Sequence, residues 1–155
     1  MSPLITVGEP GTITVQTWSY GGGVNFLGLS VPAGGFNPDV TLFDPAGFYL
    51  NDSSLGSCPP ANADSGNCFD ATLVVPVSAT GVYTVTLSAW PNVAAGATLA
   101  DGFTDGGDFF GRSPNYAMDI TYPASVPEPP GSVLLVVAII VVPLLRKTKT
   151  LKYLS

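Results

Sequence analysis

The segment GVYTVTLSAW, residues 81–90, decides the fold class. Its apolar side chains, beginning with Tyr83 and Val85, fall on alternate positions, with mainly polar residues between them. This period of two is typical of a β-strand with one buried face. The preceding segment DATLVVPV, residues 70–77, has the same character, and SATG at 78–81 is a turn sequence. The two segments therefore predict a pair of strands joined by a tight turn.

The same pattern recurs along most of the chain. Leu4–Val7 is followed by a GEPG turn and by TITVQTW at 12–18, and DVTLFDPAGFYLN at 39–51 predicts a hairpin with a type I turn. NYAMDITY at 115–122 adds a further strand, and no segment before residue 130 keeps a 3.6-residue apolar period. Six to eight short strands predict an all-β body, a jelly-roll-like antiparallel β-sandwich. A small barrel is the alternative, because periodicity does not separate the two.

Charge divides the chain into two parts. Residues 1–125 contain ten acidic side chains and a single cation, Arg112, which gives this body a net charge of −9. Residues 126–155 contain Glu128 against four cations and carry +3. An acidic body repels phosphate backbones, so we expect no nucleic-acid binding. The chain has no histidine, which excludes Ser-His-Asp catalysis and most zinc sites and leaves carboxylate chemistry and hard-metal binding open.

The last thirty residues have the composition of a membrane-directed tail. A Pro-rich linker at 126–132 precedes an apolar segment at 133–145, and a basic tail at 146–155 follows. As a single short hydrophobic helix the apolar segment would extend roughly 20 Å, against about 30 Å of hydrocarbon in a bilayer. Its eleven Val, Leu and Ile residues still favour insertion, with the cations on the cytoplasmic side. The segment comprises Val133, Leu134, Leu135, Val136, Val137, Ala138, Ile139, Ile140, Val141, Val142, Pro143, Leu144 and Leu145.

Three interpretations of this tail compete: a core helix of the body, a plain C-terminal anchor, and a sorting signal. A core helix would be amphipathic, whereas this segment is apolar on all sides. The order of Pro127, Glu128 and Pro129, then the apolar segment, then a basic stop at Arg146, Lys147 and Lys149 resembles the PEP-CTERM sorting signal of Gram-negative bacteria. That resemblance implies an inner-membrane precursor that an exosortase-like enzyme processes, and a mature protein at the cell surface of exopolysaccharide-producing bacteria.

The body carries a second resemblance, over about residues 4–122. The stretches TWSYGGG, VPAGGFNPDVTLFDPAG, GVYTVTLSAWPN and LADGFTDGGDFFG are similar to an uncharacterised all-β ectodomain family found upstream of PEP-CTERM tails. That family is distantly similar to bacterial pre-peptidase C-terminal domains, which are small jelly rolls, and it brings no assigned activity. The start MSPLITVGEP has no signal-peptide pattern. The alternatives are a trimmed chain, a start codon placed too late, or a chain that is not exported, and we expect one of the first two.

Two cysteines and several acids are candidate site residues. Cys58 and Cys68 are separated by nine residues in a polar loop, and in an exported protein they predict a disulfide. The Asp- and Gly-rich stretch DGFTDGGDFFG offers Asp101, Asp105 and Asp108 as a candidate calcium site. These aspartates are equally suited to forming turns. A carboxylate pair drawn from Asp44, Asp70 and Asp119 would be needed for glycosidase chemistry, but no spacing singles one out.

Aromatic residues offer a third kind of site. Trp18, Tyr20, Trp90, Phe109 and Phe110 would form a sugar-stacking platform if exposed, and ordinary packing contacts if loops cover them. The leading hypothesis is thus a non-catalytic, exported surface or matrix protein whose body is an interaction or structural module, with extracellular polysaccharide as a partner. A carbohydrate- or calcium-binding module is the second hypothesis, and a hydrolase that uses carboxylates alone is the third. No cofactor is expected, apart from Ca²⁺ under the second hypothesis.

Overall fold

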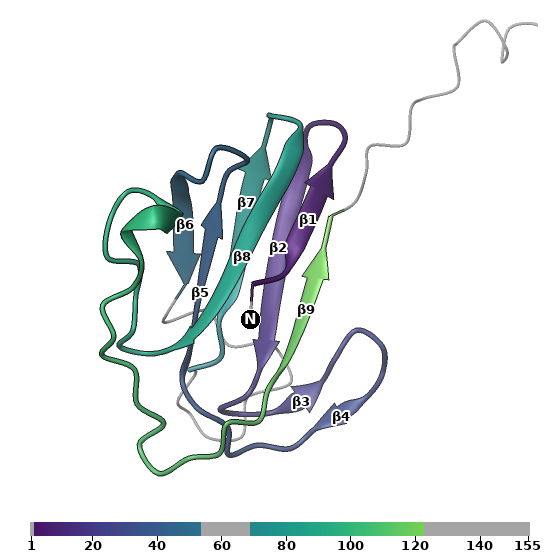
Figure 1. Cartoon of the computed structure of the whole chain (residues 1–155). Coiled ribbons are helices and arrows are strands. Elements are labelled where there is room, and N and C mark those ends of the chain that lie inside the picture. The colour runs from purple at the N-terminus through teal and green to yellow at the C-terminus, as the bar shows by residue number, and fades with distance from the viewer. Residues whose placement is uncertain (1, 54–68, 123–155) are drawn as a thin grey trace, which may run out of the picture. The chain divides into compact units, whose positions relative to one another are not determined.

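The computed structural model describes residues 2–53 and 69–122, which form an all-β body (Figure 1). The chain divides into two units, Met1–Ser125 and Val126–Ser155, and the fold described here belongs to the first. The predicted Cys58–Cys68 disulfide, the Pro127–Pro129 motif, the hydrophobic helix at 133–145 and the basic stop at Arg146, Lys147 and Lys149 lie outside the described residues. Among those that are described, no helix has both the length and the apolar character needed to cross a bilayer.

The strands form two main antiparallel sheets and a small ribbon. The four-stranded sheet has the order β1 (Leu4–Val7), β8 (Gly81–Ala89), β5 (Pro38–Phe43) and β6 (Tyr49–Ser53). The three-stranded sheet has the order β7 (Thr72–Val77), β2 (Gly11–Trp18) and β9 (Ala117–Thr121), and the ribbon pairs β3 (Gly23–Val24) with β4 (Ser30–Val31). A short 3-10 helix, η2 (Leu99–Asp101), lies in the connection from β8 to β9.

Both main sheets contribute side chains to one hydrophobic core. In the four-stranded sheet these side chains come from β1, β5 and β8, and in the three-stranded sheet they come from β2 and β7. This arrangement accounts for the alternation in the sequence, because each of these five strands turns one face to the shared core. The buried cluster comprises Val7, Ile13, Val15, Val40, Leu42, Ala71, Leu73, Val75, Val77, Tyr83 and Val85.

Most of the predicted strands are confirmed, and so is the hairpin at residues 39–51. β5 pairs with β6, and the turn between them is held by the Asp44 carboxylate, which accepts hydrogen bonds from the amides of Ala46 and Phe48. Gly47 has a φ of 84°, in the left-handed region that this turn requires. In the described residues the main sheets are open, so the arrangement is sandwich-like and differs from the small barrel that stood as the alternative.

The predicted pairing of the segments at 70–77 and 81–90 is wrong. β7 pairs with β2, whereas β8 pairs with β1 and β5, so the SATG turn carries the chain from one sheet to the other. The GEPG turn between β1 and β2 makes the same crossing, and the two crossings lie together because Val7 pairs with Gly81 and Gly11 with Val77. A turn within one sheet and a turn that crosses between sheets both connect amphipathic strands. The sequence pattern alone therefore does not tell one from the other.

This topology gathers several strand ends at one end of the body. β2 ends where β7 and β9 begin, since Gln16 pairs with Thr72 and Trp18 with Ala117. β8 ends where β5 begins, since Pro38 pairs with Ala89. The β3–β4 ribbon follows β2 at the same end (Figure 1). We call this the ribbon end, and the loops that leave it build the site described next.

Candidate functional site: an aromatic pocket

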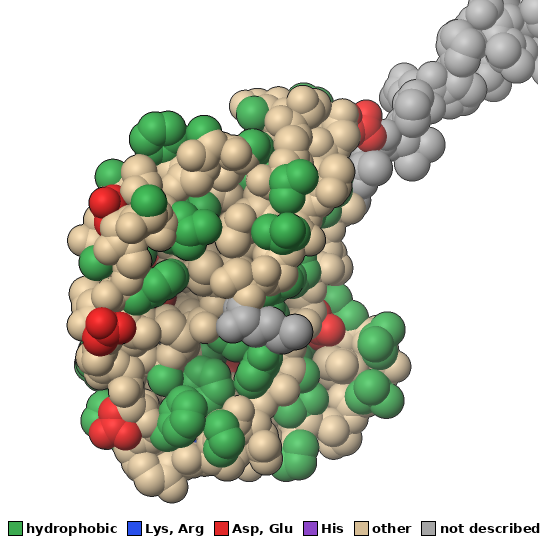
Figure 2. Space-filling model, viewed as in Figure 1, with side chains coloured by type: hydrophobic (Ala, Val, Ile, Leu, Met, Phe, Trp, Pro, Cys, Tyr) green, Lys and Arg blue, Asp and Glu red, His purple; other side chains and the backbone are tan. Residues whose placement is uncertain are grey.

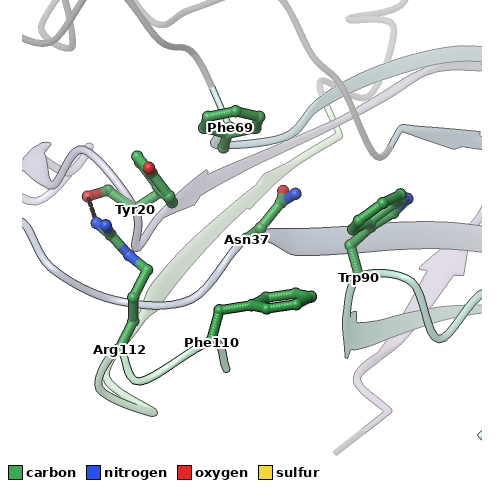
Figure 3. Close-up of a pocket in the computed structure, with 6 residues that line it drawn as sticks. All are labelled: Tyr20, Asn37, Phe69, Trp90, Phe110 and Arg112. Carbon is green, nitrogen blue, oxygen red and sulfur yellow. Dashed lines mark hydrogen bonds between the residues drawn. The ribbon is translucent and has the colours of Figure 1, made fainter. Parts of the chain in front are cut away.

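A pocket of about 340 Å³ lies at the ribbon end. The strand ends explain its composition, because Tyr20 follows β2, Asn37 precedes β5 and Trp90 follows β8. The remaining described lining comes from the segment before β7 and from the long connection between η2 and β9. We call this site the aromatic pocket; its described lining residues are Tyr20, Asn37, Phe69, Trp90, Phe110 and Arg112 (Figure 3).

Tyr20 forms one wall of the aromatic pocket. The guanidinium carbon of Arg112 lies 3.4 Å from the centroid of the Tyr20 ring, within range of a cation–π contact. The Phe69 ring lies against the same tyrosine, with centroids 4.6 Å apart and a tilt of 57°. Arg112 also donates hydrogen bonds to two backbone carbonyls, from Nε to Gly35 O at 2.5 Å and from Nη2 to Tyr20 O at 2.9 Å. Tyr20 is therefore a fixed wall with neighbours on its ring, and less suited to stacking a ligand.

Trp90 and Phe110 provide the open ring surfaces. They are 39% and 61% exposed, and in Figure 3 the Phe110 ring points away from Arg112, toward Trp90. The Trp90 amide donates to the Asn37 carbonyl at 2.9 Å, which continues the pairing of β8 with β5. Phe110 has a φ of 49° and its amide donates to the Asp108 carboxylate at 2.9 Å. A left-handed backbone is unfavourable for a bulky side chain, so the loop holds Phe110 in place at a conformational cost.

Asn37 lies among the rings, and its amide oxygen is buried with no hydrogen-bond donor among the residues that the structure describes. The polar group that it can offer to a ligand is therefore the amide N–H₂. Two residues further on, Asp39 is 1% exposed, and its Oδ1 also lacks a donor within the described part of the chain, while Thr41 Oγ1 donates to Oδ2 at 3.3 Å. Burial, with the negative charge of Asp52, raises the pKa of Asp39 to about 6.

A buried carboxylate fixes the loop that carries Tyr20. Asp70 is fully buried and accepts hydrogen bonds from the amides of Ser19 at 2.6 Å, Tyr20 at 3.2 Å and Gly21 at 2.9 Å. A hydrogen bond from the Thr17 amide to the Ala71 carbonyl joins the end of β2 to the residue before β7. Asp70 thus pairs backbone donors that would otherwise lack a partner inside the body. Because it holds the backbone amides of residues 19–21, it also fixes the position from which the Tyr20 side chain extends.

The structure brings together three of the five aromatic residues that the sequence suggested. Tyr20, Trp90 and Phe110 line the pocket, while Phe109 packs on Phe36 with ring centroids 5.1 Å apart. Trp18 is only 5% exposed, and its Nε1 donates to Asp119 Oδ2 at 2.7 Å. Trp18 is thus buried although it lies on the face of β2 opposite Ile13 and Val15, and it is an ordinary packing residue.

Sequence reasoning did not place Phe69, Asn37 and Arg112 in a site. Phe69 and Asn37 are single residues beside strands, and their meeting depends on which strands share an end of the body. Arg112 carried a usable signal, since it is the only cation among the first 125 residues.

The aspartates proposed for calcium each have a role in the loop between β8 and β9. Asp101 Oδ2 accepts bonds from the Thr98 amide and hydroxyl, and Asp108 Oδ1 accepts from Phe110. Asp105 has a φ of 57°, and its amide donates to Asn92. Nowhere in residues 2–53 and 69–122 do three acidic or cysteine side chains gather closely enough to hold a metal ion.

The carboxylates proposed for glycosidase chemistry also bind the protein itself. Asp44 holds the β5–β6 turn, and Asp70 holds the Tyr20 loop. Asp119 accepts from Trp18 and from the amide of Phe26, which attaches the β3–β4 ribbon to β9. The described lining of the aromatic pocket contains no carboxylate.

The ribbon beside this end exposes several apolar side chains. Hydrophobic side chains are visible on the ribbon in Figure 2, and the exposed ones are Val24, Phe26, Leu27 and Leu29. The tip is well defined, because the Asn25 side chain accepts hydrogen bonds from the amides of Leu27 and Leu29. Exposed apolar clusters of this kind are common at interaction surfaces.

Comparison of the chain with protein-family models, with curated proteins and with solved structures gives no significant match.

Proposed function

We propose that the body is a non-catalytic saccharide-binding module of an exported bacterial surface protein. The observation that carries this proposal is the pair of exposed rings, Trp90 and Phe110, in a pocket that also holds Asn37 and Arg112. The C–H faces of a sugar ring stack on aromatic rings, and N–H donors bind its oxygens. A few convergent polar groups in a mainly apolar lining are typical of small-molecule sites.

The size and chemistry of the pocket support binding more than catalysis. A volume of about 340 Å³ is near the lower end of ordinary ligand pockets, which suits one or two sugar rings. Glycoside hydrolysis needs two carboxyl groups beside the scissile bond, and the described lining offers Arg112 and Tyr20 as its ionisable groups.

Export is proposed from the sequence of the tail. The Pro127–Glu128–Pro129 motif, the apolar segment at 133–145 and the basic stop that follows resemble a PEP-CTERM signal. An inner-membrane precursor would have its acidic body outside and its cations inside, and an exosortase-like enzyme would release the body to the surface polysaccharide.

The direction of the last strand agrees with this role. β9 begins beside Trp18 at the ribbon end and runs to Thr121 beside Thr14. Tyr122, whose hydroxyl donates to the Glu9 carbonyl, is therefore at the other end of the body from the pocket. A body tethered through the residues after Tyr122 would have its pocket at the far end from its own attachment point.

For the fold itself we propose a jelly-roll-like sandwich. The chain leaves the four-stranded sheet after β6, adds β7 to the other sheet and returns through β8, which pairs with β5. Such crossings between sheets are features of Greek-key arrangements, of which jelly rolls contain two.

Titration calorimetry with a panel of neutral and acidic oligosaccharides tests the saccharide function. The full chain is kept in a polyoxyethylene detergent, whose head group contains no sugar. Replacing Trp90 by alanine removes about half of an aromatic surface of roughly 150–250 Å² from the ligand, or about 2 kcal/mol, and is expected to weaken binding roughly thirtyfold. Phe48→Ala is the matched control, because Phe48 is 54% exposed and does not line the pocket. Equal losses in both variants would contradict the proposal, as would a panel in which no saccharide binds.

A further inference from the structure

Arg112 is an unusual residue in this body. It is the only lysine or arginine before residue 146, in a stretch that carries eleven acids. A single cation in such a surface would be expected beside a carboxylate. In the described residues its hydrogen bonds go instead to the carbonyls of Gly35 and Tyr20, and its flat face lies on the Tyr20 ring.

These contacts orient the guanidinium and leave part of it free to bind. An arginine has five N–H donors, and two of them are directed at carbonyls. Carbonyl dipoles do not neutralise a full positive charge, so within residues 2–53 and 69–122 three donors and the charge are left without a protein partner, on a side chain that lines the aromatic pocket. Stacking on Tyr20 fixes the plane of the fork, and a fixed fork is the geometry that binds planar anionic groups well.

The other polar groups of the pocket point to the same kind of ligand. The amide oxygen of Asn37 is buried, so its N–H₂ is the group that faces a ligand, and the indole of Trp90 is a donor only. Donors therefore dominate the described lining, and a ligand that matches them is rich in acceptors. The ring surfaces of Trp90 and Phe110, in turn, select a ligand with an apolar face.

We propose that the aromatic pocket binds a saccharide carrying an anionic substituent, a carboxylate or a sulfate, with that group on Arg112 and the sugar ring on Trp90 and Phe110. This inference rests on the proposed saccharide function and specifies its ligand. The body's excess of acidic side chains slows the approach of an anion, but this long-range repulsion is screened over about 8 Å at physiological ionic strength. The contact with Arg112 is made inside the pocket, where screening is weaker.

The test compares matched ligands on the unaltered full chain in polyoxyethylene detergent at about 0.15 M salt. Uronic-acid oligomers of several ring configurations are titrated beside their methyl esters, which keep the ring shape and lose the charge. Sulfated and neutral oligomers of the same lengths complete the set. The proposal predicts that the acid or the sulfate binds at least about tenfold more tightly than its uncharged counterpart, and that added salt reduces the difference.

Each outcome separates the two proposals. If an ester or a neutral oligomer binds as tightly as the charged form, this inference is overturned and the saccharide function survives. If no oligomer of any charge binds, both are overturned. An Arg112→Gln variant adds a second arm: it is expected to bind acid and ester alike, at about the affinity that the ester has for the unaltered chain. A charge preference that persisted in that variant would overturn the role of Arg112.

Discussion

Oδ1 of Asp70 lies 2.6 Å from the amide nitrogen of Ser19, in a part of the body that solvent does not reach. The same carboxylate accepts from the next two amides along the chain. It thus acts as a cap for the exit of β2, and it sets where Tyr20 enters the aromatic pocket. Removing it would leave several donors unpaired, which is a larger loss than that of any single contact between side chains.

Replacing Asp70 by alanine is therefore expected to lower the free energy of unfolding by at least about 3 kcal/mol, because each buried unpaired donor costs roughly 1–3 kcal/mol. Asp44→Ala is the matched control: that carboxylate also accepts two amide hydrogen bonds, but in an exposed turn. Water can replace it there, so a loss of about 1 kcal/mol is expected. Urea unfolding of both variants measures the difference, and equal losses would show that burial of the Asp70 network is not what stabilises this loop.

Substitutions at Phe110 can separate the contribution of its ring to binding from the cost of its left-handed backbone. Its φ of 49° is unfavourable by about 1 kcal/mol for a residue with a side chain and costs glycine nothing. Phe110→Gly is expected to leave stability unchanged or slightly higher, while saccharide affinity falls about tenfold. Phe110→Ala removes the same ring and keeps the strain, so it is expected to be less stable than the glycine variant by about 1 kcal/mol. A glycine variant that bound as well as the unaltered chain would remove Phe110 from the site.

β1, β2, β5, β7 and β8 were predictable because each has one face in a shared core. Tyr83 and Val85 are buried and Val82 is exposed, so the alternation within β8 follows its surroundings directly. The sheet to which a strand belongs was not predictable in this way. A short turn such as Ser78–Gly81 can join strands within one sheet or across two, and only the partners, β2 for β7 and β1 for β8, decide between them.

The sequence predicted the type of residue that lines the pocket, but not which residues line it. Trp90 and Phe110 were foreseen as candidates for a platform, whereas Trp18 is buried, and its indole N–H donates to Asp119, which also accepts from the Phe26 amide. The presence of Asn37 and Phe69 depends on which strand ends meet at the ribbon end. That information lies in pairings between residues far apart in the sequence, and no local pattern carries it.

Asp39 predicts a measurable dependence of stability on pH. Its pKa in the folded chain is about 6, against an ordinary value of 3.8, so the folded state holds the proton more tightly than the unfolded state. The stabilisation is complete below about pH 4 and is lost as the pH rises through about 6. The difference amounts to no more than about 3 kcal/mol, and solvent screening lowers it. Asp39→Asn is expected to gain stability relative to the unaltered chain between about pH 4 and 7, as followed by thermal unfolding.

The charge of Asp52 contributes to this effect, so it provides an internal check. Burial is the largest cause of the raised pKa of Asp39, and the negative charge of Asp52 is the second. An Asp52→Asn variant should therefore shift the pH at which stability is lost to a lower value without abolishing the effect. If the Asp39→Asn variant kept the same advantage at about pH 4 as at about pH 7, ionisation of Asp39 would not be its cause.

The proposed sorting of the chain makes a prediction about its mass in the cell. In a Gram-negative host with an exosortase-like enzyme, the mature protein should lack the residues that follow Pro127, Glu128 and Pro129, since cleavage is expected near this motif. Intact mass spectrometry of the surface fraction measures this, and Glu128→Ala is expected to retain the tail and to stay with the inner membrane. Reduction of the same sample should add the mass of two hydrogens if Cys58 and Cys68 form a disulfide. Surface protein that kept residues 146–155 would contradict processing at the motif, whatever the body binds.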